Sequence, residues 1–155
     1  ATESGLAIVF QLSLMRQYLY CSSTLNIRKE LEMDSMFTKS FDDADEVKTP
    51  PKTHAATVKL GDISATKIVL EPGWKWSKCV KPAVGGDSCQ AGHVGVIVQG
   101  QLHCIHDDGT EIVASAGDAY YFAPGHDGWV IGDEAVVGYE FSDSGKDFGP
   151  WRTSS

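Results

Sequence analysis

Basic residues are scarce in the last third of this chain, and long apolar runs are lacking throughout it. Of its 21 acidic and 13 basic residues, 10 acids but only 2 bases fall in residues 101–155. The formal net charge is −8, whereas binding to nucleic acid or to anionic membranes depends on clustered Lys and Arg. We therefore expect no nucleic acid and no membrane among the partners.

The N-terminal third offers little that points to chemistry. Its apolar stretch, residues 6–15, contains two polar residues and is far shorter than the about 20 residues of a membrane-spanning helix. The residues before it include no Lys or Arg, which argues against a secretory signal. Residues 1–54 are predicted to be an extension and linker, in part helical or arm-like, in which Pro50-Pro51 excludes a helix. A cytoplasmic location is favoured, and secretion stays open.

The cysteines include no C-x2-C pair, so the chain lacks the spacing of zinc ribbons and thioredoxin-like sites. Cys79 and Cys89 flank a glycine-rich segment, and a disulfide between them would close that loop in a secreted protein. In a reducing compartment they would be free thiols, which is the alternative that we favour. Cys104 is expected to be a small core residue.

Turn-forming pairs punctuate the chain from residue 55 onward at intervals of 8–15 residues. They include Gly61-Asp62, Gln99-Gly100, Asp108-Gly109 and Gly117-Asp118. The segments between them are rich in β-branched and aromatic residues and show no sustained 3.6-residue period. Residues 55–142 are therefore predicted to form one all-β sandwich or barrel, followed by a tail over residues 143–155.

One β-hairpin carries the most specific prediction. If Gln99-Gly100 is a two-residue turn, His93 pairs with His106 on the face that also carries Ile97. Opposed residues have Cβ atoms about 4.5–5.5 Å apart, close enough for two imidazoles to bind one ion. His103 falls on the other face, where we expect solvent.

Glycines frame these residues with a regular spacing. Gly73 precedes Cys79 by six positions, and His93 precedes Gly100 by seven. This pattern resembles the first motif of the cupin superfamily of small jelly-roll barrels, G-x5-H-x-H-x3,4-E-x6-G. Cys79 stands at the position of the first His, Lys81 at the second His, and His93 at the Glu.

The second cupin motif, G-x5-P-x-G-x2-H-x3-N, is matched in part. Gly117 and Gly125 keep their spacing, and His126 lies two residues before the usual His position. The resemblance covers about residues 55–142. It implies a single cupin-type jelly-roll barrel that forms a homodimer.

Three histidines are the candidate metal ligands: His93, His106 and His126. Gln90 and Cys79 are candidates for a fourth ligand. A site with three nitrogens and one open position suits copper, zinc, iron or nickel, and copper is favoured among these. Each histidine by itself could instead be structural, at a strand end or in a turn.

The aromatic residues suggest a place for a substrate. Trp74 and Trp76 are two residues apart, so in an extended segment they project from the same side. Trp76 and Trp129 are expected in the core or an interface, and Trp74 is the candidate contact for a small-molecule or carbohydrate substrate. Tyr121, on the strand that leads into the second motif, is the candidate catalytic proton donor.

The leading functional hypothesis is a small mononuclear transition-metal oxidoreductase. Its substrate would be a small neutral or carbohydrate-like molecule. The alternative is a non-catalytic small-molecule-binding or sensor protein, and a dimeric structural protein is a third.

Overall fold

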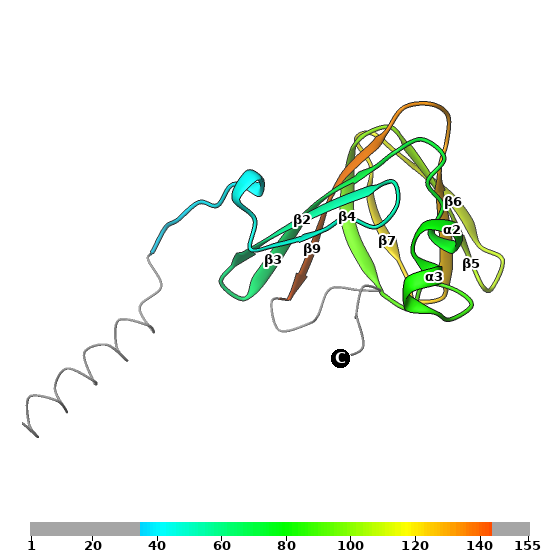
Figure 1. The fold of residues 1–155 in the computed structure, drawn as a ribbon, viewed down its shortest axis with the longest axis horizontal. Helices are drawn as coiled ribbons and strands as arrows, with labels where there is room; N and C mark the ends of the chain where they lie inside the picture. The colour runs from blue at the N-terminus through cyan, green and yellow to red at the C-terminus, as the bar shows by residue number, and fades with distance from the viewer. Residues whose placement is uncertain (1–34, 144–155) are drawn as a thin grey trace, which may run out of the picture. The chain divides into compact units, whose positions relative to one another are not determined.

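The computed structural model describes residues 35–143 and places nine β-strands in that part of the chain (Figure 1). The strands are β1 (Glu46–Lys48), β2 (Thr53–Leu60), β3 (Ile63–Leu70), β4 (His93–Gln99), β5 (Gln101–His106), β6 (Glu111–Ser115), β7 (Ala119–Phe122), β8 (His126–Val130) and β9 (Val136–Asp143). Three short helical elements accompany them: η1 (Phe41–Asp43), α2 (Trp76–Cys79) and α3 (Lys81–Val84). None of the described helices is long and apolar enough to cross a membrane.

Two antiparallel sheets enclose one apolar core. The larger has the order β1-β2-β3-β9-β4-β7 and the smaller the order β6-β5-β8. The core takes side chains from both sheets, among them Ile97, Phe122 and Val136 from the larger and Leu102 and Val130 from the smaller. In Figure 1 the long β2–β3 hairpin and the end of β9 project beyond the smaller sheet. The predicted all-β jelly roll is confirmed, although neither sheet closes on itself.

The predicted hairpin at Gln99-Gly100 is wrong. β4 pairs with β7 and β9, whereas β5 pairs with β6 and β8, so the chain crosses from one sheet to the other at Gly100. Gly100 has φ +75°, and a Cβ there would lie 2.6 Å from the Ala135 carbonyl oxygen. Only glycine fits this crossing, because the left-handed backbone and the close carbonyl both exclude a side chain.

Strand pairing begins before residue 55, the predicted start of the barrel. Within the compact unit that contains Thr38 and the described residues after it, β1 pairs with β2 and the Phe41 ring lies 5.4 Å from the Tyr139 ring. Pro50 and Pro51 form the turn between the two strands, where the Pro50 carbonyl accepts from the Thr53 amide. The helical or arm-like prediction for residues 1–34 and the tail after residue 143 lie outside the described residues.

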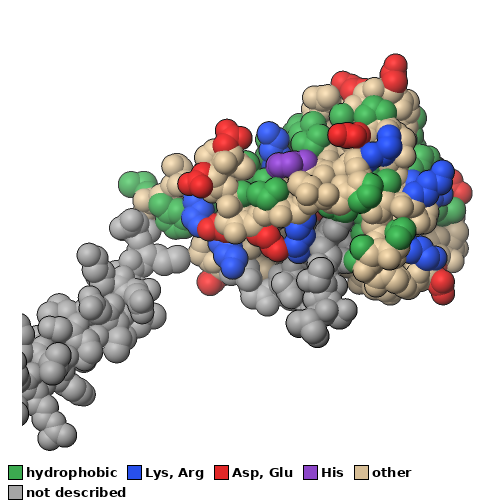
Figure 2. Space-filling view, in the orientation of Figure 1, with side chains coloured by type: hydrophobic (Ala, Val, Ile, Leu, Met, Phe, Trp, Pro, Cys, Tyr) green, Lys and Arg blue, Asp and Glu red, His purple; other side chains and the backbone are tan. Residues whose placement is uncertain are grey.

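Charged side chains of both signs are interspersed with hydrophobic ones on the face seen in Figure 2. On the described part of that face, Lys and Arg form no continuous patch.

Asp127 fastens α2 to β8. Its Oδ1 accepts from the backbone amides of Ser77 at 3.1 Å and Gly128 at 2.8 Å, and its Oδ2 lies 3.3 Å from Lys75 Nζ. Lys75 Nζ also lies 4.6 Å from the centre of the Trp129 ring. Trp129 is therefore half-buried beneath a lysine and not in the core. The sequence predicted a place in the core or in an interface, and the interface stays a prediction.

Replacing Asp127 by Ala is expected to lower the free energy of unfolding by about 1–3 kcal/mol, because the substitution leaves the part-buried Ser77 amide without its acceptor. Asp133→Ala, in the exposed turn before β9, is the matched control and should change it by less than about 0.5 kcal/mol. Urea unfolding monitored by circular dichroism measures both. Equal effects would contradict the role assigned to Asp127.

Candidate metal centre

Three potential ligands converge where the loop before β4 passes the start of β8. The ligand atoms of Cys89, His93 and His126 all lie within 4.8 Å of one another. Backbone pairing sets Cys89 beside His126: the Cys89 amide donates to the His126 carbonyl at 2.7 Å, and the Cys89 carbonyl accepts from Gly125 at 2.7 Å. The cluster is thus held by strand-like hydrogen bonds and not by side chains alone.

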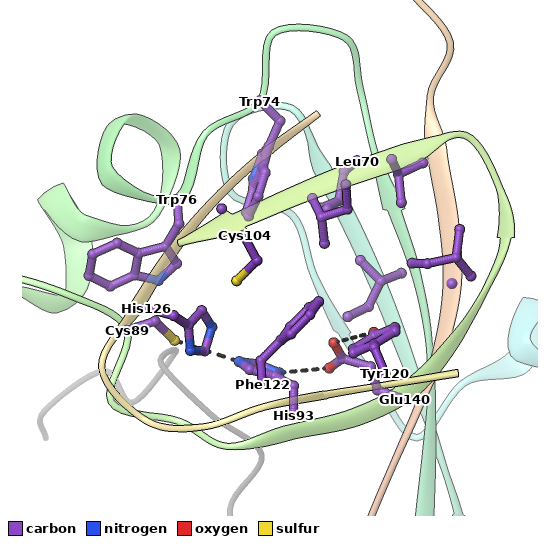
Figure 3. Close-up of a pocket in the computed structure, with 16 residues that line it drawn as sticks. Leu70, Trp74, Trp76, Cys89, His93, Cys104, Tyr120, Phe122, His126 and Glu140 are labelled. Atoms are coloured by element: carbon purple, nitrogen blue, oxygen red, sulfur yellow. Dashed lines mark hydrogen bonds and ion pairs between the residues drawn. The ribbon is translucent and has the colours of Figure 1, made fainter. Parts of the chain in front are cut away.

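A row of hydrogen bonds orients His93. Its Nδ1 lies 3.0 Å from Glu140 Oε2, and Tyr120 donates its hydroxyl proton to Glu140 Oε1 at 2.8 Å. With the Nδ1 proton donated to Glu140, His93 presents Nε2, which lies 3.6 Å from Cys89 Sγ. Figure 3 shows this row running from Tyr120 through Glu140 and His93 toward Cys89 and His126.

His126 is oriented in the same manner by the backbone. Its Nδ1 donates to the Ala123 carbonyl at 2.6 Å, which makes Nε2 the ligand atom. The rings of His93 and His126 are 5.2 Å apart and nearly perpendicular. Two imidazoles with Nδ1 engaged and Nε2 directed to a common point are the arrangement found in metal sites.

The electrostatics of the cluster favour a thiolate. Burial raises the pKa of the Cys89 thiol, but hydrogen bonds to His126 and His93 outweigh burial and lower that pKa to about 6. Burial lowers the pKa of His93, but the Glu140 charge and the hydrogen bond to Cys89 outweigh it and raise that pKa to about 10. Next to the thiolate the ring is therefore protonated on Nε2 as well, and a metal ion would have to displace that proton to bind there. Cys89 is therefore an anionic sulfur, the form that binds metal ions.

The neighbouring titratable groups stay protonated. Burial and the Cys89 charge raise the pKa of Cys104 to about 12, so Cys104 is a neutral thiol. Burial and the Glu140 charge raise the pKa of Tyr120 far above its ordinary value. Tyr120 consequently acts as a permanent donor to Glu140.

The cluster lies at the wall of a partly open, mainly apolar cavity of about 70 Å³ between the two sheets. Leu70, Trp74, Trp76, Ile97 and Phe122 are among the residues that line it. A more open hollow of about 200 Å³ shares Cys104, Phe122 and His126 with it and also contacts His106 and Tyr121. These three shared residues therefore line both the cavity and this outer hollow.

The structure brings together two of the three predicted histidine ligands, His93 and His126. His106 pairs with His126 across β5 and β8, but its ring is bonded to the Pro124 carbonyl at 2.9 Å and to Asp108 at 3.0 Å. The Pro124 carbonyl and then Asp108 raise the pKa of His106. The prediction that His106 is a ligand of the same site as His93 and His126 is therefore corrected. At the end of β5 its ring lies at the outer hollow and is held by groups outside the cluster.

Of the two predicted fourth ligands, Cys79 is not part of the cluster, and Gln90 directly follows Cys89. Gln90 is exposed and donates to Ser88 Oγ at 3.0 Å. Cys79 is buried in the apolar core on α2. Cys79 and Cys89 are both free thiols, the alternative favoured from the sequence.

The remaining predicted residues fall on different sides of the sheet. Trp74 lines the cavity, as expected for a substrate contact. Tyr121 faces outward with 65% exposure, at the outer hollow, whereas its neighbour Tyr120 faces inward. His103 stacks on Trp129 at 4.1 Å instead of standing in solvent.

Sequence reasoning missed Cys89, Glu140 and Tyr120 as residues of this site. From the sequence, Cys89 is weighed as half of a disulfide or as a free thiol and not as a ligand, although it stands four residues before His93. Glu140 could have been found as the single acid at an inward position of β9, in line with Val136 and Gly138. A buried acid in an apolar strand requires a partner, and that requirement was the available signal.

No protein-family model and no curated protein sequence matches this chain. Solved structures do match. An oxalate decarboxylase variant from B. subtilis is 15% identical with a TM-score of 0.53, over 75% of this chain and 32% of that one. The Fe(II) protein HppE is 7% identical with a TM-score of 0.51, over 72% of this chain and 63% of that one.

A third match, titled an RmlC-like cupin from Shewanella frigidimarina, is 18% identical with a TM-score of 0.48, over 77% of this chain and 95% of that one. The chain thus spans about a third of the oxalate decarboxylase and nearly all of the small protein from Shewanella. Identities this low speak to fold and not to activity. Together with the strand order of the two sheets, the matches to oxalate decarboxylase and HppE identify the fold of the described residues as a cupin-type jelly roll.

Proposed function

We propose that this cupin binds one transition-metal ion through Cys89 Sγ, His93 Nε2 and His126 Nε2 and acts as a metal-dependent oxidoreductase on a small substrate. The observation that carries the proposal is the convergence of these three ligand atoms within 4.8 Å. A thiolate with two imidazoles is a soft donor set that suits copper above the harder divalent ions. Copper is therefore the proposed metal, and zinc, iron and nickel are the alternatives to be tested.

The ion would supply Lewis-acid or electron-transfer chemistry. The residues of the chain hold and shield it. Glu140 keeps the proton on His93 Nδ1 so that Nε2 stays a ligand, and the Tyr120 hydroxyl keeps the Glu140 carboxylate in place. The apolar side chains of the cavity exclude water from the cluster, which strengthens the electrostatic interactions within it.

One fold neighbour is an Fe(II) protein by its title, which supports a metal in a fold of this kind. A carbohydrate ring is not favoured as the buried group, because the cavity of about 70 Å³ is small and mainly apolar. A small neutral molecule, or the end of a longer one that passes through the outer hollow, fits better. The homodimer stays a prediction.

Titration of metal-stripped, untagged protein with copper(II) and with cobalt(II) tests the proposal. We expect one equivalent to bind and a thiolate-to-metal charge-transfer absorption to appear. Cys89→Ser should abolish that absorption, because the sulfur is removed, whereas the matched variant Cys79→Ser should retain it. Failure to bind one equivalent, or an absorption that survives in Cys89→Ser, would refute the proposed site.

Oxygen consumption with a reductant separates the two functional classes. A metal-loaded protein that consumes oxygen or reduces a dye in the presence of small neutral substrates acts as an oxidoreductase. Stoichiometric metal without any such turnover favours the non-catalytic binding or sensor alternative. His126→Ala is the negative control, because it removes a ligand.

A further inference from the structure

The outer hollow lies where the last strands of the two sheets come near each other. β7 ends the order of the larger sheet and β6 that of the smaller, and the hollow is lined by Ile112 of β6 and by Tyr121 and Phe122 of β7. His126 lines it as well and is also a member of the metal cluster. The hollow therefore leads from the surface to a residue of the cluster.

Two large apolar side chains of the hollow are exposed. Ile112 pairs with Cys104 across β5 and β6, and paired residues place their side chains on the same face of a sheet. Cys104 is 5% exposed on that face, but Ile112 is 41% exposed and Tyr121 is 65% exposed. Exposed apolar side chains that gather in a concave site are typical of ligand-binding surfaces. Ile112 and Tyr121 are therefore placed to contact the apolar part of a ligand.

A carboxylate lies at the rim of the same hollow. The side chain of Asp108 lines the hollow and is 63% exposed. Its Oδ1 accepts from the Thr110 amide at 2.8 Å and lies 3.0 Å from His106 Nδ1. Hydrogen bonds, first that of Thr110, hold the pKa of Asp108 below its ordinary value. The rim thus carries a negative charge in a fixed position.

The surroundings of this carboxylate are acidic. Residues 101–143 contain nine acids and no Lys or Arg, and among the described residues no Lys or Arg lines the hollow. The His106 ring also lines the hollow, but its nitrogens are engaged with the Pro124 carbonyl and with Asp108. An anion in the hollow would meet negative charge without a basic partner, so a cation is the favoured ligand.

The volume of the hollow sets the size of that cation. At about 200 Å³ it exceeds the roughly 150 Å³ of an engineered apolar cavity that binds benzene. By proportion it holds roughly eight non-hydrogen atoms, the equivalent of a six-membered ring with two further atoms. A cation at the rim could also interact with the face of the Tyr121 ring.

We propose that the outer hollow binds a small amine, whose ammonium group lies beside the Asp108 carboxylate and whose apolar body packs against Ile112 and Tyr121. That such an amine is a substrate rests on the proposed metal function. The charged end would stay at the exposed rim, and an uncharged end would extend past His126 toward the cluster. Asp108 and Tyr121 would then determine which substrates the site accepts.

Three probes of nearly the same size test this choice of ligand. Benzylamine, benzyl alcohol and benzoate share one ring and differ in charge. Each is titrated into the ¹⁵N-labelled, metal-free full chain, and the amide signals of residues 108–112 and 121–123 are followed. We expect benzylamine to shift them with a dissociation constant on the order of millimolar. Benzyl alcohol should bind about threefold to fivefold more weakly, as expected for an exposed ion pair, and benzoate at least tenfold more weakly.

Asp108→Asn removes the charge and keeps an oxygen that can accept from the Thr110 amide. It should abolish the preference for benzylamine over benzyl alcohol. Asp118→Asn, in the turn at the other end of β6 and β7, makes the same charge change outside the hollow and should keep the preference. Tyr121→Ala should weaken both ligands about fivefold to tenfold, and Phe141→Ala, an exposed aromatic residue outside the hollow, should weaken neither.

Unshifted signals in the hollow, benzoate binding as tight as that of benzylamine, or a preference that survives Asp108→Asn would overturn the inference without touching the metal function. Cobalt(II)-loaded protein tests the substrate role. Because cobalt(II) is paramagnetic, the protons of benzylamine in the hollow should show pseudocontact shifts, and their absence would contradict that role. Protein that takes up no cobalt would refute the metal function, whereas the choice among the three probes is measured without metal and is decided separately.

Discussion

Replacing His126 by Ala is expected to weaken metal binding by more than 100-fold, whereas replacing His106 by Ala should change it by less than about threefold. The two residues are direct partners across β5 and β8. Only His126 has its Nε2 within the cluster, while the His106 ring is bonded to the Pro124 carbonyl and Asp108. Loss of residues that merely support a ligand costs 10–100-fold in affinity, so loss of a ligand should exceed that range.

Competition for zinc against a chromophoric chelator measures both affinities, and circular dichroism establishes that each variant is folded. The comparison is stringent because the two histidines come from paired positions in the same sheet. A loss of the same size in both variants would show that the outer hollow, and not the Cys89–His93–His126 cluster, holds the ion.

Gly95→Ala is expected to lower the free energy of unfolding by about 3 kcal/mol. A Cβ at Gly95 would lie 2.5 Å from the Tyr139 carbonyl oxygen and 2.7 Å from the Tyr120 hydroxyl oxygen. Because one of these atoms belongs to the backbone, the strands themselves would have to move. The change would also displace Tyr120 from Glu140, and metal affinity should fall by about 10–100-fold.

Gly92→Ala is the matched control, because a Cβ there meets its nearest neighbours at ordinary distances of 3.7–4.0 Å. It should cost less than about 1 kcal/mol. Urea unfolding at constant m-value measures stability, and zinc competition measures affinity. If Gly95→Ala lowers the free energy of unfolding no more than Gly92→Ala does, the position of Tyr120 does not depend on the lack of a side chain at Gly95.

The sequence predicted the jelly roll because its signals are local. Turn pairs at regular intervals and β-branched segments mark the strands, and the cupin-like glycine spacing identifies their arrangement. The predicted core residues Trp76 and Cys104 are buried as expected. Strand β1 was not predicted because it has only three residues, too few to produce a recognisable alternation.

The site was predicted only in part. The hairpin argument paired His93 with His106 on the assumption that strands adjacent in the chain are adjacent in a sheet. In this fold β4 and β5 belong to different sheets, so His93 pairs with Phe122 and His106 with His126. His93 and His126 do lie together, but the reason for their proximity is the packing of two sheets and not one ribbon, and their role as metal ligands stays a prediction.

The sequence by itself determined which segments become strands and which residues carry donor chemistry, because alternation and turn residues act over a few neighbouring positions. Only the tertiary structure decided that Cys89 and Glu140, 51 positions apart by their numbering, flank the same histidine. The physical reason is that sheet order depends on how the apolar faces of distant strands pack. A single turn at Gly100 can lead either to the next strand of the same sheet or across the core to the other.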